Sequence, residues 1–279
     1  VSLLIRHPKI ELCTITSRAH AGKSVSQVIR RVGKVGHSLK FTNPSLASLL
    51  NGEVELFFLA LPHGTAAEYA VPLVEAGKKV IDLSADFRLN DPKLYQEYYG
   101  SKPISPEWLP KAQYGLPELH KLSWEESHLI ASPGCYPTSI ITPLAPLLQK
   151  GLIETSDIIV NSISGISGAG KNASDHLLFC ERNESAGVYG LPKHRHLSEI
   201  EEQLSQFAQK TIVLSFHPHL GPMNRGICST ISVRAKGELQ ANLITKCWED
   251  TYSGRPFVQI LKDGDLPETG RVVGTNRID

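Results

Sequence analysis

The chain of 279 residues has no excess of charge of either sign. It carries 29 Lys and Arg residues against 28 Asp and Glu residues, which gives a formal net charge of +1. Such a chain produces no long-range field that would attract a nucleic acid or an anionic membrane. We therefore expect neither partner, and an anionic ligand would have to be held by local cations.

Cysteine is scarce, and no apolar run is long enough to span a bilayer. The five cysteines are scattered and form no Cys-x-x-Cys motif. An odd number of scattered thiols fits a reducing compartment better than a disulfide framework. We therefore expect free thiols and a cytoplasmic protein. No signal peptide is recognisable, although Val1 is not a natural start and a leader could precede it.

The first half of the chain alternates between strand-like and helix-like segments. Strands are predicted over 10–16, 54–61 and 80–83, and a helix over 66–76. A strand, a helix and a strand with short links form a right-handed crossover, so a parallel sheet follows. The turn after the second strand is where doubly wound sheets bind ligands. The Pro- and Tyr-rich segment 90–109 is interpreted as a surface excursion.

The second half has an α+β pattern. The predicted strands and helices are strands 157–164, 211–216 and 227–234 and helices 139–150, 198–210 and 238–250. Thr138 is predicted to cap the helix over 139–150, and Ser198 to open a capping box. The fold class is therefore α/β, a Rossmann-like doubly wound sheet followed by an α+β domain. We divide the chain near Ser132, into domains 1–131 and 132–279.

Cys135 has an unusual setting for a cysteine. It lies between Pro133-Gly134 and Tyr136-Pro137, directly after an apolar run. A nucleophile needs a sharp turn that exposes its sulfur and helix N–H groups that favour the thiolate. A free cysteine is more often a small buried hydrophobe, so the spacing alone leaves both interpretations open.

Two histidines form a second constellation. His194 and His196 flank Arg195 just before a predicted helix with an apolar face. A solvated basic turn is the plainer interpretation. A metal site is a third, but no companion ligand cluster has a suitable spacing, so we expect no metal.

A glycine-rich segment nearly matches a phosphate-binding loop. Residues 165–172 read GISGAGKN, and Asn172 stands where the loop of a nucleotide triphosphatase has Ser or Thr. The hydroxyl that would hold magnesium is missing, so this function is not expected. Small residues still let backbone N–H groups approach an anion.

Nine segments together resemble the N-acetyl-gamma-glutamyl-phosphate reductase family. They are 16–23 (TSRAHAGK), 61–64 (LPHG), 82–89 (DLSADFRL), 114–118 (YGLPE), 132–138 (SPGCYPT), 164–171 (SGISGAGK), 194–196 (HRH), 217–226 (HPHLGPMNRG) and 274–276 (GTN). They span nearly the whole chain in family order. The resemblance implies NADPH-dependent reduction of N-acetyl-gamma-glutamyl phosphate to N-acetylglutamate semialdehyde, in arginine biosynthesis, by a homodimer or homotetramer.

The resemblance also implies roles for individual residues. Cys135 would form a thioacyl intermediate, and His194 would act as general acid and base. The substrate residues would be Arg88, Tyr189, His196 and Arg225. For Arg88, an ion pair with Asp86 or Asp82 is the alternative.

The cofactor implied by the resemblance is NADP. Its binding residues would be Ser17, Arg18, Pro62, His63, Gly64, Ser167, Gly168, Gly170 and Asn276. A hydroxyl and a guanidinium after the first strand suit the 2′-phosphate of NADP better than an acidic residue would.

The sequence departs from the family at both ends. The glycine-rich N-terminal loop of the family is absent, and so are its last strand and helix. We therefore expect a fragment with weak NADPH turnover. Three alternatives stay open: an enzyme like aspartate-semialdehyde dehydrogenase, a cysteine hydrolase, and a non-catalytic remnant that binds or oligomerises.

Overall fold

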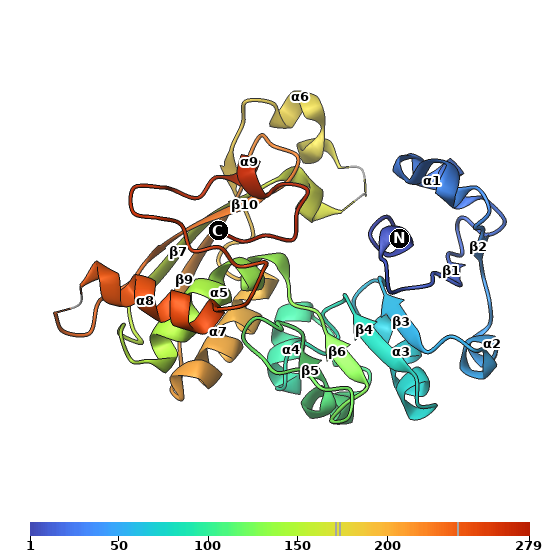
Figure 1. The fold of residues 1–279 in the computed structure, drawn as a ribbon, viewed down its shortest axis with the longest axis horizontal. Helices are drawn as coiled ribbons and strands as arrows, with labels where there is room; N and C mark the ends of the chain where they lie inside the picture. Colours follow the sequence, from blue (N-terminus) through green and yellow to red (C-terminus); the bar gives the residue numbers. More distant parts are fainter. Residues whose placement is uncertain (171, 173, 239) are drawn as a thin grey trace.

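The structure, a computed structural model, describes residues 1–170, 172, 174–238 and 240–279. The N-terminal elements and a parallel sheet lie at one end of the molecule (Figure 1). A mixed sheet with its covering helices lies at the other end. The candidate site lies where the parallel sheet leads into the first of these helices, α5 (Cys135–Gln149).

The parallel sheet has the strand order β3-β4-β6-β5, and every pairing in it is parallel. Its strands are β3 (Leu56–Leu59), β4 (Lys79–Asp82), β5 (Gln113–Tyr114) and β6 (Leu129–Ala131). Helix α3 (Ala66–Glu75) connects β3 to β4 and packs Ala66, Ala70 and Leu73 into the core of this sheet. The predicted strand–helix–strand crossover is therefore confirmed.

A separate two-stranded parallel sheet precedes this one. It consists of β1 (Ile15–Thr16) and β2 (Phe41–Thr42), with the short helices α1 (Val25–Val28) and α2 (Leu46–Asn51) nearby. The strand predicted over 10–16 is wrong over 10–14, which form no strand. Among the described residues β1 pairs only with β2, and backbone without a neighbouring strand has no ladder to join.

The segment predicted as a surface excursion contains two helical elements. They are α4 (Pro92–Tyr99) and a 3₁₀ helix (Pro106–Lys111). Tyr95 and Leu109 are each only 1% exposed. The other residues of 90–109 are exposed or half-buried, so the segment lies at the surface as predicted, and these two buried side chains anchor it.

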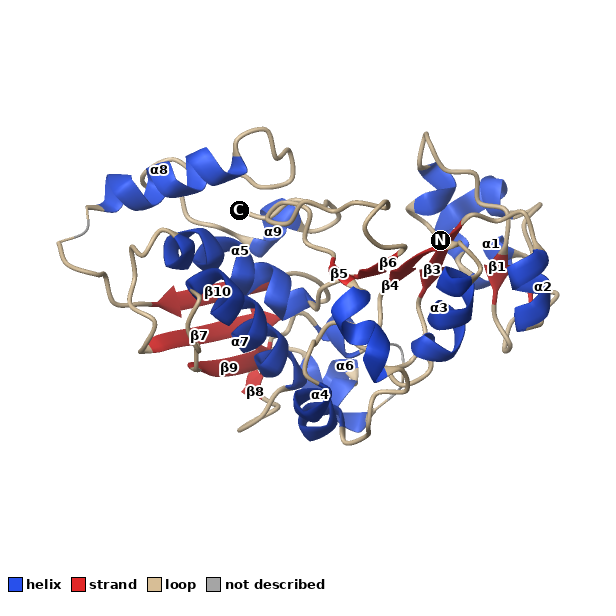
Figure 2. Cartoon of the chain, turned by 90° about the horizontal axis from the view of Figure 1, so that it is seen from below, coloured by secondary structure: helices blue, strands red, loops and turns tan. Residues whose placement is uncertain are grey.

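The second half forms a mixed sheet of order β10-β7-β9-β8. Its strands are β7 (Ile158–Ser164), β8 (Gly187–Val188), β9 (Leu214–Leu220) and β10 (Ile227–Ser232). Helices α5, α7 (Arg195–Ala208) and α8 (Ala241–Tyr252) lie on one side of it (Figure 2). The predicted α+β pattern is confirmed with shifted ends, and the short helices α6 (Phe179–Arg182) and α9 (Thr269–Val272) are additional.

The sheet buries one face and exposes parts of the other. In β7, Ile158 and Val160 join the core beneath the helices, whereas Ile159 between them is 41% exposed. Residues alternate between the two faces of a strand. The exposed positions of β7 therefore belong to a face that the three helices leave open.

Both site helices begin earlier than predicted. Gly134 is the N-cap of α5, so Thr138 lies inside the helix, where its hydroxyl donates to the Gly134 carbonyl at 2.9 Å. His194 is the N-cap of α7, so Ser198 lies in its first turns. Both predicted caps are wrong. Among the described residues, no helix has the length and apolar character needed to cross a membrane.

Candidate active site

Cys135 is the first residue of α5 and is exposed to solvent. The pKa of its thiol is raised, mainly because neighbouring protein reduces its solvation on the remaining sides. The backbone N–H groups of Cys135 and Tyr136 and the charge of Arg88 act in the opposite direction. The resting thiol is therefore protonated, while the start of the helix supplies dipoles that favour the thiolate.

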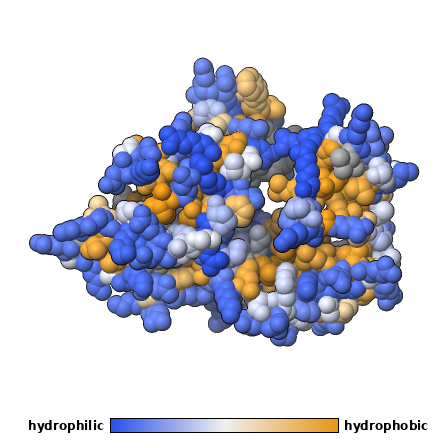
Figure 3. Space-filling view, in the orientation of Figure 1, coloured by the Kyte–Doolittle hydropathy of each residue, from blue (hydrophilic) through white to orange (hydrophobic). Residues whose placement is uncertain are grey.

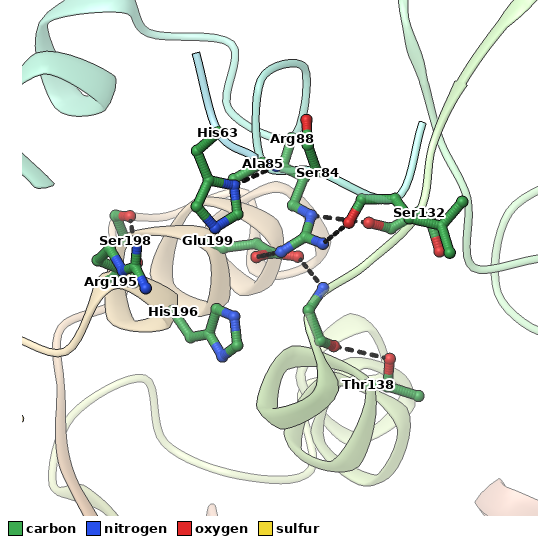
Figure 4. A network of polar contacts seen from close by, with 12 residues as sticks. His63, Ser84, Ala85, Arg88, Ser132, Thr138, Arg195, His196, Ser198 and Glu199 are labelled. Atoms are coloured by element: carbon green, nitrogen blue, oxygen red, sulfur yellow. Dashed lines mark hydrogen bonds and ion pairs between the residues drawn. The ribbon is translucent and has the colours of Figure 1, made fainter. Parts of the chain in front are cut away.

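The turn before Cys135 is held by two buried side chains. Arg88 donates from Nε to the carbonyl of Ser132 at 2.7 Å, and Glu199 accepts from the backbone N–H of Gly134 at 2.8 Å. Arg88 and Glu199 also form an ion pair with an N–O distance of 3.4 Å. Figure 4 shows how α7 meets the turn through this pair.

The structure therefore gives Arg88 a different ion-pair partner from the predicted alternatives. Its carboxylate partner is Glu199 rather than Asp86 or Asp82. Nη2 donates to the carbonyl of Leu83 at 2.9 Å. A guanidinium carries five N–H groups, so two are left for a ligand beside these three contacts.

Both predicted histidines lie against residues next to Cys135. A β-carbon added to Gly134 would lie 2.6 Å from Nε2 of His196. The ring centroid of His194 lies 5.4 Å from that of Tyr136. His196 thus lies against Gly134, the residue before Cys135, and both imidazole rings lie against Tyr136, the residue after it.

The hydrogen bonds of His194 define its tautomer. Its Nδ1 accepts from the backbone N–H of His196 at 3.1 Å, so the ring proton of the neutral side chain is on Nε2. Burial and the neighbouring charge of Arg195 lower the pKa of His194 to about 4. Burial, followed by His194 and nearby arginines, lowers the pKa of His196 to about 2. Both rings are therefore neutral near pH 7.

Tyr189 packs beside the predicted acid–base group. Its ring lies 5.5 Å from that of His194, and its hydroxyl donates to the hydroxyl of Tyr136 at 2.9 Å. Tyr136 in turn contacts Phe216 of β9, with 5.1 Å between the ring centroids. This aromatic group fixes the histidine side of the site on the mixed sheet.

The predicted cofactor turn 62–64 is anchored by the segment after β4. Asp86 accepts from the N–H groups of Gly64 at 2.7 Å and Ala67 at 3.2 Å. His63 Nδ1 accepts from the N–H of Ala85 at 3.0 Å, which leaves the proton on Nε2. Burial and the charges of Arg195 and Arg88 lower the pKa of His63. Because a carboxylate already occupies the start of α3, the turn presents side chains rather than these N–H groups to a ligand.

Two predicted segments meet at the end of the mixed sheet. Ser167 and Gly168 lie in a 3₁₀ helix (Ile166–Ala169), followed by Gly170. The N–H of Ser167 donates to the carbonyl of Asn224 at 3.0 Å, which places Arg225 beside this turn. Arg225 is exposed. These positions from the predicted cofactor and substrate sets are therefore adjacent.

The remaining cofactor positions lie elsewhere. Ser17 and Arg18 follow β1, and Arg18 donates to the hydroxyl of Tyr69 on α3 at 3.0 Å. Asn276 lines a pocket of about 220 Å³ together with Thr138 of α5. Figure 3 shows apolar side chains around a hollow between the N-terminal elements and the second half of the chain.

Sequence reasoning missed Glu199 and Asp86. Glu199 was not singled out in the sequence, yet it is fully buried. Hydrophobic periodicity gives no signal for it, because the residues three and four positions later are Glu202 and Gln203. Asp86 was considered only as an alternative ion-pair partner of Arg88, and no local signal indicated its contacts with Gly64 and Ala67.

Two family models define the class of this protein. The semialdehyde dehydrogenase NAD binding domain matches residues 1–127, and the semialdehyde dehydrogenase dimerisation domain matches residues 135–279. Among curated relatives, the N-acetyl-gamma-glutamyl-phosphate reductase of Akkermansia muciniphila is 46% identical over 99% of this chain and 80% of its own length. That of Saccharophagus degradans is 44% identical over 98% of this chain and 79% of its own length. The chain belongs to the semialdehyde dehydrogenase family and, within it, to the N-acetyl-gamma-glutamyl-phosphate reductases.

Solved structures support the same fold. Aspartate semialdehyde dehydrogenase II of Vibrio cholerae, complexed with ASA, has a TM-score of 0.67 at 15% identity, covering 98% of this chain and 79% of its own. The Candida albicans aspartate semialdehyde dehydrogenase with NADP has a TM-score of 0.64 at 16% identity, covering 96% and 80%. At this identity the likeness concerns the fold alone.

Proposed function

We propose that this protein reduces N-acetyl-gamma-glutamyl phosphate to N-acetylglutamate semialdehyde with NADPH, a step in arginine biosynthesis. The observation that carries the proposal is the place of Cys135. It is an exposed thiol at the start of a helix, with His196 against the residue before it and His194 against the residue after it.

Cys135 is the proposed nucleophile. Its thiolate attacks the acyl carbon, a C–S bond forms, the bond from that carbon to the phosphate oxygen breaks, and phosphate leaves. A thioester remains, which is easier to reduce than a carboxylate. The N–H groups at the start of α5 stabilise the thiolate as it forms.

His194 is the proposed general acid and base. In the resting tautomer the proton on Nε2 can donate a hydrogen bond to an oxyanion. To act as the base, the ring must carry its proton on Nδ1, which removes the hydrogen bond from the backbone N–H of His196 and lets Nε2 accept the thiol proton. A pKa of about 4 keeps the resting ring neutral near pH 7, as the base role requires, and the imidazolium formed with the thiol proton is the acid that returns this proton to an oxyanion.

The residues at the proposed cofactor positions fit NADP. When bound, NADPH supplies the hydride that reduces the thioester. Arg18 is an exposed guanidinium suited to the 2′-phosphate, and among the described residues its one hydrogen bond from the side chain is to Tyr69. An added β-carbon would meet no atom within 4 Å at Gly64 or Gly170, so a ligand has room to approach both residues, although the N–H of Gly64 is already bound by Asp86. The other proposed contacts are Ser17, Pro62, His63, Ser167, Gly168 and Asn276.

The substrate carries a carboxylate and a phosphate, which we assign to two guanidinium groups and one neutral imidazole. The proposed residues are Arg88 through its two remaining N–H groups, exposed Arg225, and His196 as a neutral hydrogen-bond partner. Tyr189 is proposed to line the same site, because it packs on His194.

An enzyme assay tests this function directly. The protein is mixed with N-acetylglutamate semialdehyde, phosphate and NADP, and NADPH formation is followed at 340 nm. Cys135→Ala should abolish turnover, whereas Cys13→Ala, which alters an exposed thiol outside the site, should not. Aspartate semialdehyde serves as the competing substrate. Equal activity on both aldehydes, or turnover that survives Cys135→Ala, would refute the proposal.

We further propose that two copies associate through the open face of the mixed sheet. The family model for residues 135–279 is described as a dimerisation domain, and Ile159 is exposed on this face. Sedimentation should show a homodimer that Ile159→Lys dissociates, while Leu266→Lys, at an exposed apolar site in a C-terminal loop, has no effect. A homotetramer would need a second contact surface.

We also propose a domain boundary near Ser132. We propose a cytoplasmic location as well, and the free thiols support this location.

A further inference from the structure

Glu199 is a fully buried carboxylate that contacts the catalytic turn. It lies in the first turns of α7 and is 0% exposed. Its Oε1 accepts from the N–H of Gly134 and from the hydroxyl of Tyr114, both at 2.8 Å. The residue directly before Cys135 is therefore hydrogen-bonded to α7, the helix that has His194 as its N-cap and contains His196.

The second oxygen of this carboxylate extends the contact to another element. Oε2 lies 3.4 Å from Nη1 of Arg88, and Nε of Arg88 donates to the carbonyl of Ser132. Glu199 and Arg88 form one ion pair, and they bind the N–H of Gly134 and the carbonyl of Ser132, respectively. This pair joins the segment after β4, the turn before α5 and the first turns of α7.

A buried ion pair is a poor way to gain stability. The cost of removing two charges from water often exceeds their attraction, and apolar side chains of similar volume pack as well or better. The contacts of Glu199 are also directional, because two donors converge on one oxygen. Such an arrangement fixes a geometry more than it adds stability.

We propose that Glu199 is a positioning residue for Cys135. It holds the turn so that the sulfur at the start of α5 stays in register with His194 and His196 on α7. This inference rests on the proposed function and adds a residue that acts through Gly134, without itself contacting the substrate.

The test compares three variants by steady-state kinetics and by alkylation. Glu199→Ala removes both oxygens, whereas Glu199→Gln keeps one oxygen to accept from Gly134 and Tyr114. Glu201→Ala is the matched control, because Glu201 lies on the same helix and accepts from the backbone N–H of Leu214 at 3.0 Å, away from the turn.

We expect kcat to fall in Glu199→Ala and to be largely retained in Glu199→Gln. Glu199→Ala should lower kcat by about 10- to 100-fold with KM changed by less than about threefold. Glu199→Gln should keep about a third of kcat or more, and Glu201→Ala should keep all of it. Equal kcat in the alanine variant, or a loss confined to KM, would overturn the inference.

Alkylation gives a readout that does not depend on turnover. The rate of Cys135 with iodoacetamide is divided by that of exposed Cys13 in the same molecule. Loss of the carboxylate and release of the turn should raise this ratio about threefold in Glu199→Ala. Glu201→Ala should leave it unchanged. An unchanged ratio in Glu199→Ala would contradict the contact.

Two outcomes separate this inference from the proposed function. A wild-type protein that is inactive on the acyl phosphate refutes the function, while the alkylation ratio still tests the positioning. If neither Glu199 variant folds, Tyr114→Phe decides, because it removes one donor to the same oxygen. It should lower kcat about threefold at constant KM, and an unchanged kcat would refute the role.

Discussion

The imidazole of His196 occupies the space that a side chain at Gly134 would need. Nε2, Cδ2 and Cε1 of the ring all lie within 3.0 Å of the position for a β-carbon. The backbone of Gly134 has φ −66°, which any residue adopts. Glycine is therefore required here by the close approach of the ring and not by backbone conformation.

Gly134→Ala should displace His196 or the turn that holds Cys135. We expect kcat to fall about 100-fold because a displacement of about 1 Å is enough for such a loss. Unfolding free energy should fall by about 1–3 kcal/mol through overpacking. Gly270→Ala, where the nearest atom lies 4.0 Å from the added carbon, is the control. Normal kinetics in Gly134→Ala would show that the ring moves aside freely.

Asp86 links the proposed cofactor turn to the rest of the site. It accepts from Gly64 and Ala67 at the start of α3 and from the hydroxyl of Tyr95. Asp86→Ala should lower unfolding free energy by about 1–3 kcal/mol and loosen the turn. We expect weaker NADPH binding, measured by quenching of protein fluorescence. Lys93→Ala, on an exposed position of α4, serves as the control. Undiminished NADPH affinity in a destabilised Asp86→Ala would limit Asp86 to a structural role.

Parts of the fold could be predicted because they follow local patterns. The apolar run around β3, the helix α3 and the run at β4 give the parallel crossover directly. Cys135 and His194-Arg195-His196 could be singled out as candidates for the same reason, since each is a compact motif. Their contacts with Gly134 and Tyr136 follow from the tertiary fold, which brings α7 against α5.

The caps of α5 and α7 were misplaced for a local reason. Thr138 and Ser198 have side chains that often cap helices, yet their own backbones are already helical.

The other missed features depend on partners that are distant in the sequence. Glu199 pairs with Arg88, 111 residues earlier in the chain, and no local pattern shows such a pair. The strand over 10–16 failed likewise, because a strand needs a neighbour that sequence periodicity does not supply.

The thiol of Cys135 should titrate above the ordinary range of cysteine in the free protein. Burial raises its pKa more than the helix start and Arg88 lower it. The alkylation rate of Cys135 in the folded protein should therefore keep rising with pH after that of Cys135 in the urea-unfolded protein has levelled off. Peptide mass spectrometry after timed iodoacetamide labelling measures this site in both states. A profile for the folded protein that levels off at lower pH than that of the unfolded protein would contradict the raised pKa.

His194 should make folding stability depend on acid pH. Its pKa is about 4 in the folded protein, against an ordinary value of 6.5, so the unfolded chain binds more protons between these values. Stability from this group is fully present above about pH 6.5 and is lost as pH falls toward 4. His194→Asn should therefore reduce the slope of unfolding free energy in this window by up to about 1.4 kcal/mol per pH unit.

Urea titrations of both proteins from about pH 4 to pH 7 measure that slope. Asp82, whose pKa is raised by burial to about 6, acts in the opposite direction, because its stability contribution falls as pH rises through this window. The difference between wild type and variant cancels its effect. Because His194 also lowers the pKa of His196, the same comparison is repeated in a His196→Asn background, which isolates the contribution of His194. His217→Asn is the matched control, since His217 lies on the exposed side of β9, where Asn161 is its partner. If His194→Asn leaves the slope unchanged while stability at pH 7 is retained, His194 is solvated and cannot be the neutral, buried base that the site requires.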